Sequence, residues 1–307
     1  MMSEITYRFS GHQTFPLRIA WLPKAAAEIR EGLDPLTNPD DGIERLGLGK
    51  NMVDALRCWI DAYQIANHSP EGWTLTPIGD LIFGADGLDP YLEDSSTPWV
   101  LHWLIATNRK SPFWAWECLF NRWTSTEFHV SAVLEAFRRQ TDQTQKPAAA
   151  ITLKQHWEVF LHTYRPPQGD TGEDNLDTAL GVLRLIQPAG ERQNSAGKWE
   201  NLYAFAYGPK RTLPQQLFGF FLHDWWDHAF PQEQTVPFRD ILNSHLSPGR
   251  ILKMQEFEIA ERLTDLASRQ AKIFQIVESS NIRQVRRLRR PRGFEEVRSA
   301  FRNPWFL

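Results

Sequence analysis

Residues 46–83, LGLGKNMVDALRCWIDAYQIANHSPEGWTLTPIGDLIF, determine which fold the sequence predicts. Gly47 and Gly49 interrupt the backbone before a run in which apolar residues recur at helical spacing. This apolar stripe comprises Val53, Leu56, Ile60 and Tyr63, and the polar residues of the opposite side are Lys50, Asp54, Arg57 and Asp61. The run therefore predicts an amphipathic helix with one face in a core and one polar face outside.

The segments on either side of this helix predict the short elements of a winged helix-turn-helix. Residues 67–72 have turn chemistry, residues 73–75 suit a small strand, and Pro77 can open a further helix. Upstream, residues 21–31 predict an alanine-rich helix and residues 41–46 a brief second helix. Three helices followed by a hairpin are the order of a winged helix-turn-helix, although any small helical domain can alternate in this way.

The length of 307 residues predicts two or three domains. The polar stretch 140–150, QTDQTQKPAAA, is the predicted linker. We expect a winged-helix domain with a helical extension over residues 1–140, and a helical, winged-helix-like domain with an arginine-rich hairpin over residues 151–307. Residues 175–206 repeat the helix-then-hairpin pattern of the first domain. The predicted fold is therefore mainly α, with tandem winged helix-turn-helix-like modules, small β-wings and a C-terminal β-hairpin.

The composition indicates the cellular compartment of the protein. Two cysteines, Cys58 and Cys118, give no disulfide framework and suit a reducing compartment. No apolar run is long enough for a signal peptide or a bilayer span, so we expect a cytoplasmic protein without membrane contact. Thirteen tryptophans are many, and some are expected at interfaces or stacking surfaces.

Positive charge is concentrated at the C-terminal end. Residues 283–307 hold eight arginines and two glutamates, whereas the whole chain has a net charge of −3. Alternation over residues 273–277 and 282–288 predicts a hairpin with Arg283, Arg287 and Arg289 on one face. Such arginines can neutralise DNA phosphates, or can only protect an edge strand from aggregation. The predicted DNA contacts are Lys24, Lys50, Asn51, Arg57, Arg283, Arg286, Arg287, Arg289 and Arg290, with Arg292 in the same cluster. Asp54 and Asp61 would oppose phosphate contact.

Three groups of residues could carry chemistry. The acidic loop 86–97 contains Asp86, Asp89, Glu93 and Asp94, which could hold Mg²⁺ or could only be solvated. His12 in the sequence GHQTF (11–15) could act as a base or phosphate contact, or could anchor the N-terminal arm. In HDWWDH (223–228), His223 with Asp227 and Asp224 with His228 could bind a metal, although structural pairs are the more frequent outcome. No motif for nucleotide binding, zinc proteolysis or serine hydrolysis is present, so the residues alone show no active site.

Three motifs resemble one prokaryotic family: FSGHQTFPLRIAWLPK (9–24), LGLGKNMVDALRCW (46–59) and DPYLEDSSTPWVLHW (89–103). The chain resembles the SspB-like family of DNA phosphorothioation defence systems, long described as a domain of unknown function. Weaker similarity continues through FLHTY (160–164) and SPGRILKM (247–254). Gln13 stands where the family usually has glutamate.

The resemblance implies a protein that binds double-stranded DNA and nicks it so that sulfur enters the backbone. It implies a sulfur-transfer enzyme and ATPases as partners, and it leaves a homodimer open. The motifs do not identify catalytic residues; His12, Asp89, Glu93 and Asp94 are the candidates for a nicking site, with Asp89, Glu93 and Asp94 as ligands of Mg²⁺. The alternatives are a non-catalytic DNA-binding adaptor or transcription regulator, and a protein scaffold without DNA affinity.

Overall fold

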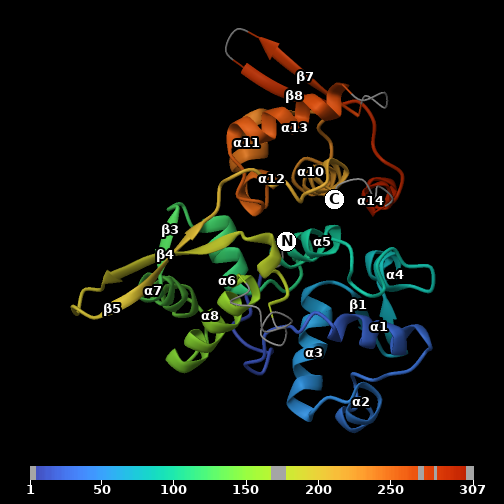
Figure 1. Ribbon diagram of the computed structural model, residues 1–307, viewed down its shortest axis with the longest axis vertical. Helices are drawn as coiled ribbons and strands as arrows, with labels where there is room; N and C mark the ends of the chain where they lie inside the picture. Colours follow the sequence, from blue (N-terminus) through green and yellow to red (C-terminus); the bar gives the residue numbers. More distant parts are fainter. Residues whose placement is uncertain (1–4, 167–177, 269–272, 280–281, 302–307) are drawn as a thin grey trace. The chain divides into compact units, whose positions relative to one another are not determined.

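The computed structural model describes residues 5–166, 178–268, 273–279 and 282–301. It divides into two compact units, Met1–Ala206 and Tyr207–Leu307 (Figure 1). Unit 1 contains α1 (Trp21–Arg30), α2 (Pro39–Leu46), α3 (Lys50–Ala62), β1 (Ala66–Ser69), β2 (Gly72–Leu75), α4 (Pro77–Phe83), α5 (Ser96–Ala106), α6 (Trp114–Trp116), the π-helix η1 (Glu117–Arg122), β3 (Glu127–His129), α7 (Val130–Thr141), α8 (Ala150–Tyr164), the 3₁₀ turn η2 (Gly181–Leu183), β4 (Ile186–Gln193) and β5 (Trp199–Phe205). Unit 2 contains α10 (Gln215–Ala229), β6 (Thr235–Pro237), α11 (Phe238–Asn243), α12 (Pro248–Ile251), α13 (Glu256–Ser268), β7 (Phe274–Ser279), β8 (Ile282–Arg287) and α14 (Glu295–Phe301).

Helices are accompanied by small antiparallel sheets, so the fold is mixed α/β and not mainly α as predicted. The sheets of the described residues have the strand orders β1-β2, β3-β5-β4 and β6-β8-β7. The two three-stranded sheets each join strands far apart in sequence: β3 pairs with β5, and β6 with β8. Such pairings leave no local signal, because the pattern of one strand does not identify its neighbour.

The amphipathic helix predicted from residues 46–83 is confirmed as α3. Its apolar stripe is fully buried, as the side chains of Val53, Leu56, Ile60 and Tyr63 show. Gly47 ends α2 in the left-handed conformation, with φ of 66°, which glycine adopts without strain. The hairpin β1–β2 follows α3, and Pro77 opens α4 behind Thr76, whose hydroxyl accepts from the amide of Gly79.

The domain boundary lies elsewhere than expected. Residues 140–150 connect α7 to α8 inside unit 1, and the units divide between Ala206 and Tyr207. The reason is the pairing of β3 with β5, which puts segments from both sides of the expected linker into one sheet. A polar, alanine-containing stretch is therefore a surface loop here and not a domain linker.

Aromatic side chains form the core of unit 1. The hydroxyl of Tyr164 lies 2.7 Å from His102 Nδ1 and accepts from Trp116 Nε1 at 3.0 Å. Trp59, Trp99, Trp103 and Trp116 are fully buried. Most tryptophans of the described residues are thus core residues, and few are free to stack on a ligand.

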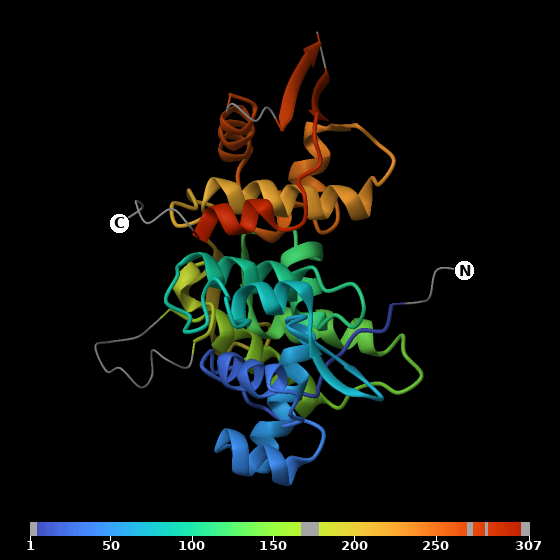
Figure 2. The same cartoon turned by 90° about the vertical axis from the view of Figure 1, so that its right-hand side faces the viewer.

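Unit 2 is built around α10. Figure 2 shows α14 lying along α10, and the two helices are in contact. The hairpin predicted around residues 279–281 is confirmed, with β7 and β8 paired antiparallel from Phe274 with Arg287 to Ser279 with Ile282. No helix among the described residues is long and apolar enough to cross a membrane.

Candidate nucleic-acid interface

The polar face of α3 points outward. Lys50, Asn51 and Arg57 are exposed, as the sequence predicts. Asp54 is half-buried one turn before Arg57, and its carboxylate forms an ion pair with the Arg57 guanidinium at 2.9 Å. The residues of this face are therefore available to a ligand, with one of the two opposing acids already paired.

A groove of about 660 Å³ runs beside this face. α3 contributes Arg57, Cys58 and Asp61, and the hairpin β1–β2 contributes Asn67, His68 and Trp73. The N-terminal arm adds Arg8, Gly11 and Gln13, and the loop after α5 adds the exposed Lys110. The sequence pattern does not point to Arg8 and Lys110, because neither belongs to the helix that carries the pattern. Lys24, although exposed on α1, does not line this groove.

Arg8 holds the arm against the groove and neutralises its second acid. Its guanidinium lies 3.0 Å from Asp61 and 4.4 Å from the centre of the Phe113 ring. Its Nε donates to the carbonyl of Ser111 at 2.9 Å. Asp61, which would oppose phosphate contact, is therefore compensated from within the protein.

Cys58 is not a reactive thiol. Burial raises the pKa of its side chain to about 11, against a smaller lowering by Arg8. A thiol in this state is protonated at neutral pH and is a poor nucleophile.

His12 is buried and does not face the solvent as a base would. Its Nε2 lies 3.2 Å from His156 Nδ1, and His156 Nε2 accepts from the amide of Ala115 at 3.0 Å. Because His156 Nε2 accepts, its proton sits on Nδ1 and is donated to His12, which must then carry its own proton on Nδ1. Burial, with a contribution from Arg8, lowers the pKa of His12 to about 4. Of the two roles open from the sequence, the geometry favours the anchor of the arm.

The acidic loop after α4 does not fit a magnesium centre. Asp89 is buried, and its carboxylate accepts from the amides of Glu93 at 2.7 Å and Asp94 at 3.2 Å and from the hydroxyl of Thr97. Asp94 in turn accepts from the amide of Ser96 at 2.7 Å, at the start of α5. The carboxylates of Asp89 and Asp94 accept from backbone donors at a helix start, and this arrangement does not fit a set of metal ligands.

The sequence HDWWDH does not form a metal site either. His228 Nδ1 lies 2.7 Å from the backbone oxygen of Asp224. His223 faces Glu296, with Nε2 3.5 Å from Oε1, and Asp227 pairs with Arg287. Asp224 and His228 therefore form a structural pair, with Asp224 Oδ1 3.4 Å from His228 Nδ1, whereas His223 and Asp227 turn to separate partners. Nowhere in the described part of the chain do three His, Cys, Asp or Glu side chains gather as metal ligands.

The arginines of β8 alternate between two sides of the hairpin. Arg287 is buried over the Trp226 ring, where it pairs with Asp227 at 2.5 Å. Arg283 lies 4.5 Å from the Phe238 ring, on the same side of the strand. Arg286, between them, is exposed. The expectation that Arg283 and Arg287 share a face is correct, but that face is turned inward and is not a DNA surface.

Beyond β8, exposed arginines surround a hollow of about 830 Å³. This arginine hollow is lined by Arg289, Arg290, Arg292, Gly293, Phe294, Glu295 and Arg298. Arg289 pairs with Glu295 at 3.6 Å, and Arg290 donates to the carbonyl of Pro231 at 2.8 Å. Arg292 and Arg298 are exposed without an ion pair in the described part of the chain. Positive charge of this segment therefore reaches the surface at the arginine hollow and, on the strand, at Arg286.

Residues 9–297 match the family described as "Protein of unknown function (DUF4007)". The chain belongs to this family. Its fold is similar to that of two solved chains, "SspB crystal structure" and "Magnesium ion-bound SspB crystal structure". Each has a TM-score of 0.80 and 22% identity, and the alignments cover 98% and 99% of this DUF4007 chain and 91% of each solved chain. No curated protein matches the chain. The resemblance to the SspB-like family is thereby confirmed, and at this identity the likeness to the solved chains shows the fold.

Proposed function

We propose that this protein binds double-stranded DNA as a component of a phosphorothioation system. One observation supports this most: the exposed polar face of α3 lies beside a hairpin and a groove whose acids are already paired by Arg57 and Arg8. The order α1, α2, α3, β1–β2 is that of a winged helix-turn-helix, with α3 as the helix that enters the major groove. The resemblance to the SspB-like family supplies the biological setting.

Each predicted contact on α3 has a distinct role in this proposal. Lys50 contacts a backbone phosphate, which adds affinity without sequence preference. The side chain of Asn51 can hydrogen-bond to the edge of an adenine. Arg57 can contact a phosphate or the edge of a guanine when it leaves its ion pair with Asp54. The arginine hollow of unit 2 is a second, sequence-neutral phosphate contact.

DNA nicking, which the resemblance implies, stays a prediction. His12 is buried and Asp89 is occupied by backbone donors, so neither is available to a substrate as the structure stands. This observation favours the non-catalytic adaptor over the nicking enzyme. A sulfur-transfer enzyme and ATPases are the proposed partners of either form.

Binding is tested with a labelled duplex in fluorescence anisotropy over a series of salt concentrations. We expect Lys50→Ala with Arg57→Ala to weaken binding about tenfold or more, because two charge contacts of about 1 kcal/mol each are lost. Lys154→Ala, an exposed lysine on α8, is the control and should bind as the unchanged protein does. Equal affinity of all three proteins would contradict the assigned face, and no binding by the unchanged protein would favour the scaffold.

Nicking is tested with supercoiled plasmid and Mg²⁺. Open-circle product that disappears with EDTA and in Asp94→Ala would establish the enzyme and the acidic loop together. Product that persists in Asp94→Ala would place the reaction elsewhere, and binding without product would establish the adaptor.

A further inference from the structure

The distal half of the β4–β5 hairpin is a two-stranded ribbon whose residues, apart from Asn194 and Glu200, are exposed to solvent. β3 pairs with residues 202–204 of β5 only, so residues 199–201 have β4 as their single neighbour. Every residue of β4 after Ile186 is exposed. Figure 1 shows this ribbon reaching out from the helices of unit 1. A two-stranded ribbon by itself gains little stability from burial. Packing against the core therefore does not explain why this hairpin is so long.

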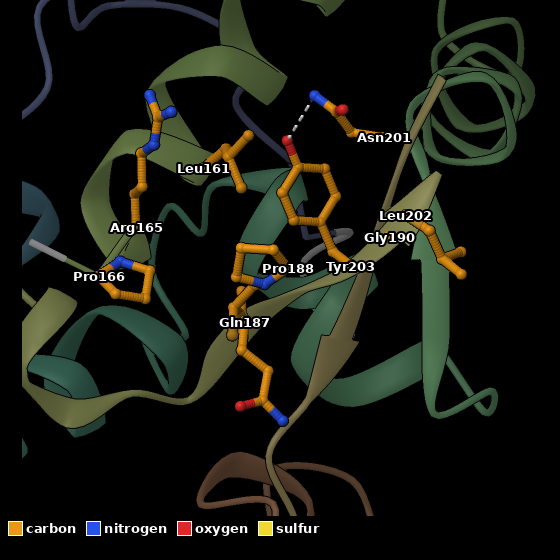
Figure 3. A pocket seen from close by; sticks show the side chains of 10 residues that line it. Leu161, Arg165, Pro166, Gln187, Pro188, Gly190, Asn201, Leu202 and Tyr203 are labelled. Carbon is orange, nitrogen blue, oxygen red and sulfur yellow. Dashed lines mark hydrogen bonds between the residues drawn. The ribbon is translucent and has the colours of Figure 1, made fainter. Parts of the chain in front are cut away.

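The base of the ribbon is fixed, and so is its tip. At the base, Leu161 of α8 and Arg165, the residue after this helix, line with Tyr203 a cavity of about 210 Å³ (Figure 3). At the tip, the side-chain oxygen of Asn194 accepts from the amides of Ala196 at 3.0 Å and Lys198 at 3.1 Å. The turn is thus held by its own side chain, and the ribbon is presented in one conformation.

Trp199 stands at the start of β5, next to this tip. It is 61% exposed, whereas Trp123 is half-buried and the other tryptophans of the described residues are buried. No ring contact or hydrogen bond of its indole is present within the described residues. A single exposed tryptophan needs no explanation by itself, but this one stands on the rigid end of a ribbon.

The charges around Trp199 favour an anionic partner. Arg192 and Lys198 are exposed and have no ion pair in the described part of the chain. Glu200, directly across from Arg192, is turned to other groups: it lies 2.7 Å from His129 and accepts from the amide and hydroxyl of Ser131. Glu191 is the one acid of the distal ribbon left exposed.

We propose that this distal ribbon, residues 190–201, lies in a groove of duplex DNA. The inference rests on the proposed function and assigns it a second contact element in unit 1. The major groove is about 12 Å wide and admits a two-stranded ribbon as well as a helix. Arg192 and Lys198 contact the phosphates that line the groove, and Trp199 packs against the sugars or base edges between them. Gln193 and Asn201, on the same face of the ribbon as Trp199, face base edges.

The test measures duplex affinity of the full chain against salt concentration. Arg192→Ala with Lys198→Ala should lower the slope of log K against log salt by about 2, because each phosphate contact contributes about 0.9. Trp199→Ala should weaken binding about fivefold to tenfold without changing the slope, and Trp199→Phe should restore most of the loss. Glu191→Gln should tighten binding, which a merely structural residue would not do.

The control is Arg138→Ala with Arg139→Ala, two exposed arginines on α7 in the same unit. If this pair lowers the slope as much as the ribbon pair does, the effect is one of net charge and the inference is wrong. If the ribbon variants bind like the unchanged protein while the α3 variants are weakened, the ribbon inference falls and the proposed function stands. If the unchanged protein binds no duplex, both fall.

Discussion

Two sets of arginines that are close in sequence lie in opposite environments in unit 2. Arg283 and Arg287 on β8 turn inward to aromatic rings and to Asp227, whereas Arg292 and Arg298 beyond the strand are exposed at the arginine hollow. The difference arises because alternate residues of a strand face opposite sides, and β8 lies between β6 and β7 over a core. The number of arginines in a segment therefore does not give the charge that reaches a ligand.

The largest effect is expected from the inward set. Arg287→Ala should lower the free energy of unfolding by about 3 kcal/mol, because it removes a buried guanidinium from the Trp226 ring and leaves Asp227, which is 43% exposed, with Arg290 at 3.6 Å. Urea denaturation measures this. Arg286→Ala, exposed on the other side of the same strand, should change stability by no more than about 0.5 kcal/mol. Equal effects of the two changes would mean that β8 has no inward side.

In unit 1, His12 and His156 form a buried pair of titratable side chains. The pKa of His12 is lowered from 6.5 to about 4, so the unfolded chain binds a proton in that window that the folded chain does not. Stability contributed by the neutral imidazole is therefore complete above pH 6.5 and falls by about 3 kcal/mol as the pH drops towards 4.

Urea denaturation between pH 4 and 7 tests this. His12→Asn should make the dependence of stability on pH shallower by the contribution of His12, and burial, which also lowers the pKa of His156 and His223, leaves the remainder. His162→Gln, an exposed histidine on the same helix as His156, serves as the control and should leave the dependence unchanged. A slope as steep in His12→Asn as in the unchanged protein would show that His12 does not contribute to it.

Glu296 is a buried carboxyl that should lower the stability of unit 2 at neutral pH. Burial, with a contribution from Glu295, raises its pKa from 4.5 to about 8, and neither of its oxygens has a hydrogen-bond partner among the described residues. The unfolded chain loses this proton above pH 4.5, so the cost of burial grows from pH 4.5 to 8. Glu296→Gln should therefore stabilise the protein by about 2 kcal/mol at pH 7 and by nothing near pH 4.5. Glu295→Gln, exposed beside it, should show no such gain; a gain of equal size there would assign the effect to net charge.

The sequence predicted the elements that local pattern determines. The stripe of α3, the proline-opened α4 and the β7–β8 hairpin follow from spacing within a dozen residues. Residue types alone could not predict what each polar group would contact. His12 contacts His156, 144 residues away, and the carboxylate of Asp89, a residue type that binds metals, accepts from the backbone amides of Glu93 and Asp94. Partners brought together by tertiary packing decide whether a histidine or carboxylate is available, and one sequence does not show them.

The smallest effect expected is that of the outward arginines on DNA affinity. Arg292→Ala and Arg298→Ala should each weaken duplex binding by about 1 kcal/mol and reduce the salt slope by about 0.9, since each removes from the arginine hollow one exposed charge that has no ion pair within the described residues. Arg239→Ala, exposed on α11 and paired with Asp240, is the matched control in the same unit. Because both changes lie on the surface, the free energy of unfolding should stay within about 0.5 kcal/mol of the unchanged protein, which separates them from Arg287→Ala. If both variants have the same salt slope as the unchanged protein, these outward arginines do not contact phosphate. The two sets of arginines would then differ only in how their side chains pack.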